Sequence, residues 1–172
     1  MTSVSFLYFA YGSNMSRRRL TAATRAPSAK PLGPASVSGH RLTFDKVSAD
    51  GSGKADCERT GDLTDKVHGG LFLVDTADLA ALDKAEGAAG AAPGYRRAEV
   101  VVWTEDGAKK VLTYLATNKR PGLLPYPWYV NHVLVGAREF GLPPDYMAAL
   151  ERLPTQQDFN SAREALELAT YP

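Results

Sequence analysis

The sequence predicts an α+β protein, because strand-like segments come first along the chain and helix-like segments gather near its end. The clearest hairpin pattern is two β-rich runs, 97–104 and 108–116, around the turn Glu105-Asp106-Gly107. From Tyr126 onward, apolar residues recur at three-to-four spacing instead. Neither an internal repeat nor a linker interrupts the 172 residues, so we expect a single domain over 1–172.

The composition is that of an ordinary globular chain with little net charge. Hydrophobic residues make up 44% and charged residues 23%, and 20 basic against 19 acidic residues leave a formal net charge of +1. This balance does not support a nucleic-acid or membrane-surface role, which usually needs a basic excess. No apolar run approaches the roughly 20 residues of a bilayer-spanning helix, and the first residues lack a secretory-signal pattern. Cys57 is the only cysteine, which excludes an internal disulfide, so we expect a cytoplasmic protein.

Turn and strand signals divide the first half of the chain. An apolar run without polar alternation is typical of a strand buried on both faces, and proline-rich or glycine-rich charged stretches are typical of loops. On these grounds we expect a strand over 3–10, a helix over 15–23 capped by Ser13 or Asn14, a proline-rich connector over 25–35, a strand over 35–48 and a mobile surface loop over 49–66.

The second half opens with a strand over 67–74, whose Gly69-Gly70 pair predicts a bulge or a close backbone approach. Asp75 or Thr76 can cap a helix over 77–86, and Gly87 suits its end. After the flexible connector 87–94 and the hairpin, we expect three helices: one over 126–140 that stops at Gly141, one over 145–153, and a last one opened by the capping-box pattern from Ser161 to Glu164.

The stretch Tyr11-Gly12-Ser13-Asn14 is the most unusual feature, because an apolar strand runs directly into a polar turn and then a helix. Such a junction exposes backbone N–H groups at a helix N-terminus, which suits a carboxylate or a phosphate. Gly12 permits a sharp turn and a close approach. A single glycine does not make a Walker loop or a dinucleotide-binding fingerprint. The alternative is a capped tight turn that holds no ligand.

Glu86 is the candidate acid/base. Leu79 and Leu82 define the apolar stripe of the 77–86 helix, and at about 100° per residue Glu86 falls within roughly 20° of Leu79. The carboxylate is therefore expected at the buried face of the last turn, where the helix dipole and desolvation both raise its pKa. Such an environment suits a general acid/base that works near neutral pH. The alternative is a side chain rotated into solvent at a frayed helix end.

Other chemistries have weaker support. His40, His68 and His132 lack metal-ligand spacing, so we expect no zinc site. Cys57 lies in the segment expected to be a mobile loop, which disfavours a cysteine nucleophile. Ser13 lacks the G-x-S-x-G context of a hydrolase nucleophile.

Two further groups of residues have ordinary structural interpretations. The first, expected to form a solvated helix face, comprises Arg17, Arg18 and Arg19. The second, interpreted mostly as core aromatics, comprises Tyr95, Tyr126, Trp128 and Tyr129. Tyrosines beside a loop-borne site can also donate a hydrogen bond to a polar ligand.

Taken together, these segments resemble the γ-glutamylcyclotransferase family over most of the chain. FLYFAYGSNM (6–15) looks like the family's opening strand and signature loop, VHGGLFLV (67–74) is similar to its central strand, and LDKAEG (82–87) to the segment that carries the catalytic glutamate. GYRRAEVVVW, YLATN and VGAREFGLPPDYMAALE resemble later landmarks in the same order and at similar spacing.

The resemblance implies a compact mixed β-barrel with surrounding helices and a cavity at one end. It implies an enzyme that converts a γ-glutamyl amino acid or dipeptide into 5-oxoproline and the free amine, through attack by the substrate's own α-amine. No cofactor or metal is implied. The residues that match the family's site are Tyr11, Gly12, Ser13 and Asn14 in the binding loop, Glu86 as the general acid/base, and Tyr95 and Tyr129 near the pocket.

Two alternatives stay open. The first is a relative that acts on γ-glutamyl amines, such as γ-glutamyl-lysine or a γ-glutamyl-protected natural-product intermediate, and the second is a non-catalytic binding module of the same fold. The segments 49–66 and 85–95 depart from the family pattern and can border the pocket, so the leaving amine is undetermined. We expect a small-molecule γ-glutamyl substrate, no nucleic acid and no membrane as partners; a homodimer is left open.

Overall fold

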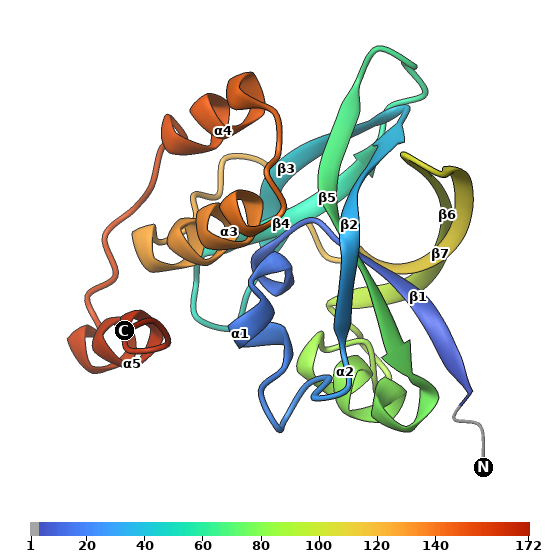
Figure 1. The fold of residues 1–172 in the computed structure, drawn as a ribbon. Helices are drawn as coiled ribbons and strands as arrows, with labels where there is room; N and C mark the ends of the chain where they lie inside the picture. Colours follow the sequence, from blue (N-terminus) through green and yellow to red (C-terminus); the bar gives the residue numbers. More distant parts are fainter. Residues whose placement is uncertain (1–3) are drawn as a thin grey trace.

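The computed structural model describes residues 4–172, which form a closed five-stranded barrel, a separate two-stranded sheet and a set of helices (Figure 1). The strands are β1 (Ser5–Ala10), β2 (Lys30–Ser38), β3 (His40–Val47), β4 (Gly53–Arg59), β5 (Lys66–Asp75), β6 (Tyr95–Thr104) and β7 (Gly107–Ala116). The helices are α1 (Arg17–Leu20), α2 (Leu79–Ala85), α3 (Pro127–Glu139), α4 (Pro144–Glu151) and α5 (Ser161–Leu168), with 3-10 turns η1 (Ser13–Met15) and η2 (Thr76–Asp78). This arrangement confirms the α+β class and the mixed β-barrel.

The barrel runs in the order β1-β5-β2-β6-β7 and is closed by the return of β7 to β1. Its neighbours pair antiparallel except at the closure, where Tyr8 and Leu112 are parallel partners. The hydroxyl of Thr113 in β7 also donates a hydrogen bond to the carbonyl of Phe9 at 2.8 Å. Closure turns one face of every strand toward a shared core.

The expected close approach at Gly69-Gly70 is confirmed. A Cβ at Gly69 would lie 2.3 Å from the carbonyl oxygen of Ala10, and one at Gly70 would lie 2.2 Å from the ring of Phe140. The register shift in this region lies in the partner strand β2, between Pro31 and Gly33, and not in β5.

The connector expected over 25–35 is wrong in its second half, because β2 begins at Lys30. Proline cannot donate to a ladder, so it is tolerated where one side of a strand is open. Beyond its pairing with β5, β2 meets β6 only at Ser36, which leaves Pro31 and Pro34 with one open side. The single strand expected over 35–48 is also wrong: Gly39 has φ of +73° and turns the chain between β2 and β3.

The mobile loop expected over 49–66 is also wrong, because it contains β4, which pairs antiparallel with β3. Ala55 and Cys57 are only 1% and 2% exposed, so the strand is part of the core. Burial raises the pKa of the Cys57 thiol, which keeps it protonated and unreactive.

The helices lie where the sequence predicts them, but two of them have other N-cap residues than expected. Helix α1 is capped by the Ser16 hydroxyl, which accepts from the Arg19 N–H, rather than by Ser13 or Asn14. Helix α5 is capped by Asn160, one residue before the expected box. Helices α2 and α3 match the expected segments, and Gly87, at φ +63°, ends α2. The strand expected over 3–10 corresponds to β1, and the first residue of that expected range, Ser3, lies outside the described residues.

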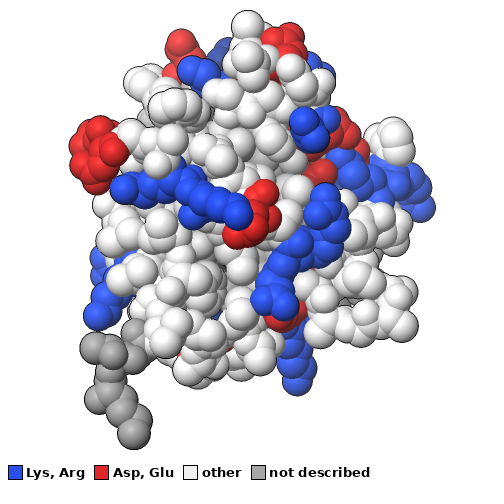
Figure 2. Space-filling model, turned by 90° about the vertical axis from the view of Figure 1, so that its right-hand side faces the viewer, with Lys and Arg blue, Asp and Glu red and all other residues white. Residues whose placement is uncertain are grey.

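Helices α3, α4 and α5 lie on one side of the barrel, and α2 lies at one end of it (Figure 1). Figure 2 shows a face of the molecule on which basic and acidic side chains are interspersed rather than separated by sign. Within residues 4–172, no helix is long and apolar enough to cross a bilayer.

Candidate active site

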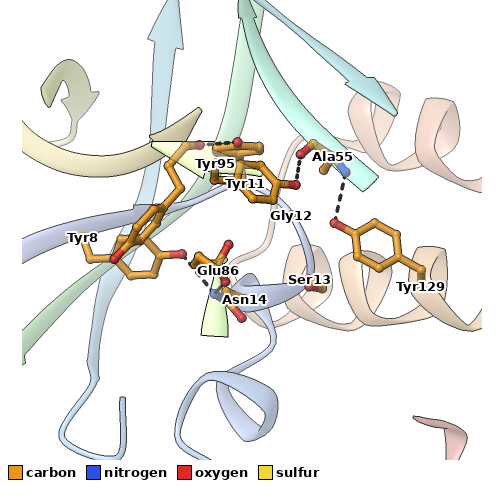
Figure 3. Close-up of a pocket in the computed structure, with 10 residues that line it drawn as sticks. Tyr8, Tyr11, Gly12, Ser13, Asn14, Ala55, Glu86, Tyr95 and Tyr129 are labelled. Carbon is orange, nitrogen blue, oxygen red and sulfur yellow. Dashed lines mark hydrogen bonds between the residues drawn. The ribbon is translucent and has the colours of Figure 1, made fainter. Parts of the chain in front are cut away.

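A pocket lies where β1 ends, between η1 and the last turn of α2 (Figure 3). It is lined by Tyr8, Tyr11, Gly12, Ser13, Asn14, Ala55, Glu86, Tyr95, Tyr114 and Tyr129. The structure therefore brings all seven residues expected at the site into one pocket. Their catalytic and binding roles remain predictions.

The loop after β1 lines the pocket and leaves backbone N–H groups without a protein acceptor. Met15 N–H donates to the Gly12 carbonyl at 3.1 Å and closes the short η1 turn. Within residues 4–172, no protein group accepts from the backbone N–H of Gly12, Ser13 or Asn14. Three free donors at the start of a helical turn suit a carboxylate or a developing oxyanion.

Gly12 lies where a side chain would have little room. A Cβ at this position would lie 3.1 Å from Ala55 Cβ and 3.1 Å from the Tyr129 hydroxyl, so the pocket wall touches the loop directly.

Glu86 follows α2 directly as its C-cap residue and points into the pocket (Figure 3). Only 16% of its side chain is exposed, so it is not rotated out to solvent. Its Oε1 accepts from Asn14 Nδ2 at 2.5 Å and lies 3.5 Å from Arg25 Nη1. Among the described residues its second oxygen, Oε2, has no hydrogen-bond partner. One oxygen is therefore anchored, and the other is open to exchange a proton with a guest.

The pKa of Glu86 is raised above its ordinary value. Desolvation is the largest cause, and it outweighs the charge of Arg25, the hydrogen bond from Asn14 and the charges of Arg19 and Lys46, which all lower the pKa. A carboxylate whose pKa is moved toward neutrality is the property that a general acid/base needs.

Ala55 of β4 fixes two tyrosines through its backbone. Tyr95 donates its hydroxyl to the Ala55 carbonyl at 2.6 Å, and the Tyr129 hydroxyl accepts from the Ala55 N–H at 3.1 Å. Tyr129 thus keeps its own proton for a guest, whereas Tyr95 keeps an acceptor lone pair. Burial raises the pKa of both phenols, so both stay neutral. Across the pocket, Tyr11 donates to the Tyr114 carbonyl, and Asn14 reaches Tyr8 Oη at 3.2 Å.

Sequence reasoning missed Arg25, which lies in the proline-rich connector. Its Nη1 donates to Asn14 Oδ1 at 3.1 Å, so it fixes which end of the Asn14 amide faces Glu86. A connector has no periodicity, so no local signal marks this residue. Arg19 was also misjudged: its side chain is only 17% exposed and pairs with Glu167 at 2.9 Å, whereas Arg17 and Arg18 are exposed as expected.

Tyr8 and Tyr114 lie on strands, and the sequence alone does not show which of their side chains face the pocket. Ala55 was missed because its segment was expected to be a loop. The four aromatic residues Tyr95, Tyr126, Trp128 and Tyr129 are all buried, as expected.

Comparison with known proteins points to one family. The model described as the AIG2-like family matches residues 66–150. Gamma-glutamylcyclotransferase of Homo sapiens is 30% identical over 171 residues, covering 95% of this chain and 86% of the human protein. A protein of the same name from Bos taurus is 29% identical over 170 residues, again covering 95% and 86%. A solved structure of a gamma-glutamyl cyclotransferase has a TM-score of 0.81 at 29% identity and covers 96% of this chain and 99% of its own. The fold and these relatives together place the chain in the γ-glutamylcyclotransferase family.

Proposed function

We propose that the protein is a γ-glutamylcyclotransferase that converts a γ-glutamyl amino acid or dipeptide into 5-oxoproline and the free amine. The observation that carries the proposal is the anchored Glu86, whose open Oε2 shares a pocket with the free N–H groups of Gly12, Ser13 and Asn14. A role in glutathione metabolism and a cytoplasmic location remain predictions.

The chemistry needs no nucleophile from the protein. The substrate's α-ammonium first loses one proton to solvent, and the free amine then attacks the γ-carbonyl carbon, forming the ring C–N bond. As this bond forms, Glu86 accepts the second proton from the attacking nitrogen, and the loop N–H groups hydrogen-bond the negative oxygen of the tetrahedral intermediate. Glu86 then delivers its proton to the departing nitrogen as the original C–N bond breaks, which releases the lactam and the free amine without consuming water.

Two properties of the pocket support this sequence of steps. The raised pKa of Glu86 brings its proton affinity closer to that of an amine, which makes both proton transfers easier. The tyrosines that Ala55 holds limit the space beside the loop, which favours a folded, ring-closing substrate over an extended one.

Replacing the carboxyl of Glu86 by an amide tests the proposal. Glu86→Gln keeps the size of the side chain and an oxygen that Asn14 can contact, but it cannot carry a proton between the two nitrogens. We expect 5-oxoproline formation from γ-glutamyl-alanine to fall about 10²–10⁴-fold, the range of general acid/base catalysis. Glu105→Gln, on the exposed hairpin turn, is the matched control and should retain full activity. Full activity in Glu86→Gln would refute this mechanism, and a wild-type protein that binds the substrate without turnover would favour a binding module.

A further inference from the structure

A second, wider pocket opens beside the active-site pocket and shares Ser13, Glu86, Tyr95 and Tyr129 with it. Its remaining lining is strongly basic: the cationic residues are Arg19, Arg25, Lys46, Lys54 and Lys84. Glu86 is the only acidic residue among those that line it. Because Glu86 belongs to both pockets, a γ-glutamyl group bound in the inner pocket would extend its leaving amine into this basic outer pocket.

Three of the five cations already have a carboxylate partner. The pairs are Arg19–Glu167 at 2.9 Å, Arg25–Glu86 at 3.5 Å and Lys54–Asp50 at 2.8 Å. Lys46 and Lys84 differ from these, because no carboxylate in the described chain lies within 4.0 Å of either ammonium group. Two positive charges at the outer pocket are therefore left for a guest.

Lys46 is held at the boundary between the two pockets. Its ammonium lies 4.7 Å from the ring centroid of Tyr95, a residue that lines both pockets. Burial lowers the pKa of Lys46, whereas the charges of Glu86 and Asp50 raise it. An anion beside this ammonium would supply the counter-charge that the fold does not provide.

The position of Lys46 is electrostatically unfavourable in the fold alone. In the β3–β4 ladder its partner is Lys54, and like charges directly opposite each other destabilise a sheet. Lys54 is neutralised on its own side by Asp50 and lies over the ring of Trp128 at 4.4 Å. Lys46 also lies over an aromatic ring, that of Tyr95, but no carboxylate in the described chain lies within 4.0 Å of it. Lys84 lies on α2, two residues before Glu86, and is exposed toward the same pocket.

We propose that Lys46 and Lys84 form a leaving-group subsite that selects γ-glutamyl compounds whose leaving amine carries carboxylates. An acidic amino acid, with an α-carboxylate and a side-chain carboxylate, can engage both lysines. An amino acid with a neutral side chain offers one carboxylate, and a simple amine offers none. This inference rests on the proposed cyclotransferase activity and names the class of leaving amine that the activity favours.

A panel of three substrates tests the subsite: γ-glutamyl-glutamate, γ-glutamyl-alanine and γ-glutamyl-methylamide, with kcat/KM measured for each. The wild-type protein should prefer them in that order. Lys46→Gln and Lys84→Gln should each lower the ratio of kcat/KM for the glutamate substrate to that for the methylamide by about three- to tenfold, the size of a partly exposed charge interaction. The ratio is informative because any effect of the variants on Glu86 itself enters both values and cancels.

Two controls accompany the variants. Lys84→Arg keeps the positive charge and should retain the ratio, and Lys66→Gln, at the end of β5 away from α2, should leave the ratio unchanged. Added salt should lower the wild-type ratio, because it screens exposed charges. Equal wild-type turnover of all three substrates, or an unchanged ratio in both glutamine variants, would overturn the subsite while leaving the cyclotransferase activity standing. No turnover of any of the three would overturn both proposals.

Discussion

At the scale of single residues, Glu86 experiences opposing influences on its pKa. Desolvation raises the pKa, whereas Arg25 and Asn14 lower it through charge and a hydrogen bond. Because both contacts reach Oε1, they also fix the orientation of the carboxyl and leave Oε2 toward the pocket. Arg25 and Asn14 are therefore positioning residues that set the pH at which Glu86 can accept a proton.

Removing the charge of Arg25 should move the pH dependence of the reaction in a known direction. Arg25 favours the ionised form of Glu86, so Arg25→Gln should raise the pKa of Glu86 further. The acidic limb of the kcat/KM profile for γ-glutamyl-alanine should then shift to higher pH. Arg18→Gln, whose side chain is exposed, is the control and should not move the limb. A limb that stays in place or moves to lower pH would contradict the assignment of Glu86 as the base.

Ionisation of the Glu86 carboxyl should lower the free energy of unfolding as the pH rises. In the folded protein the pKa of Glu86 lies above its ordinary value, so the folded state binds a proton that the unfolded chain has already lost. The wild-type free energy of unfolding should therefore fall between the ordinary pKa and the raised one. Glu86→Gln does not titrate, so its Tm relative to wild type should increase as the pH is raised from about 4 to 7. Thermal unfolding followed by circular dichroism measures this difference, and a constant difference across the range would contradict it.

At the scale of elements, helix α3 sets the position of the η1 turn through Gly136. A Cβ at this residue would lie 2.3 Å from Met15 Cβ and 2.5 Å from the Ser16 backbone nitrogen. Alanine normally stabilises a helix relative to glycine, so a loss of stability in Gly136→Ala would report this contact and not propensity. We expect a loss of about 2–3 kcal/mol from overpacking, which corresponds to a Tm roughly 5–10 °C lower. Arg138→Ala, on the exposed face of the same helix, should change the free energy of unfolding by less than about 0.5 kcal/mol.

The C-terminal helix α5 is attached to α1 and α3 through Glu167. Its Oε2 lies 2.9 Å from Arg19 and 2.8 Å from His132 Nε2. The hydrogen bond with His132 and the charge of Arg19 hold the pKa of Glu167 below its ordinary value. A lowered folded pKa stabilises the protein above the ordinary value, and this contribution is lost as the pH falls. Glu167→Gln should therefore lower Tm at pH 7 by roughly 2–4 °C, for about 1 kcal/mol, and have little effect near pH 3. A Tm difference that is equally large at both pH values would show that Glu167 acts through packing instead.

Local periodicity explains which parts of this fold were predictable. The 3.6-residue repeat of α2 placed Glu86 at the pocket because a short amphipathic helix is defined by its own residues. Strand β4 was not predicted because its buried residues, such as Ala55 and Cys57, are small and glycines precede them. The segment forms a strand because it pairs with β3. Arg25 was not predicted because its role depends on contacts with two residues outside its own segment, Asn14 and Glu86. Glu86 was therefore predictable from the pattern of its own helix, whereas Ala55 and Arg25 are placed by tertiary contacts that no local pattern shows.

At the scale of the whole molecule, the pocket depends on two sheets that share no ladder. The barrel contributes the loop after β1, whereas Ala55 comes from the β3–β4 sheet and fixes the hydroxyls of Tyr95 and Tyr129. The two sheets are tied together near residue 119. Asp56 of β4 accepts from the Ala116 N–H of β7 at 2.8 Å, and an isolated bridge pairs Lys46 with Lys119.

Lys119 supplies the charge that holds this junction. Its ammonium lies 2.9 Å from Asp56, 2.7 Å from Glu58 and 3.3 Å from Asp45. The side chain of Asp56 is only 5% exposed, so removing the ammonium leaves a carboxylate with little access to water. Breaking a buried pair on one side is strongly destabilising, by about 3–5 kcal/mol for full burial and less for a partly exposed cation.

Lys119→Met should therefore weaken the docking of the β3–β4 sheet on the barrel. We expect Tm to fall by roughly 5–10 °C, for about 2–3 kcal/mol. We also expect kcat/KM for γ-glutamyl-alanine to fall, because Ala55 would no longer hold Tyr95 and Tyr129 in place. The double variant Lys119→Met/Asp56→Asn removes the uncompensated charge while keeping an acceptor for the Ala116 N–H, so it should recover part of both losses. If the single variant keeps both its Tm and its activity, the two sheets are joined by backbone contacts and packing alone, and the pocket does not depend on this cluster of charges.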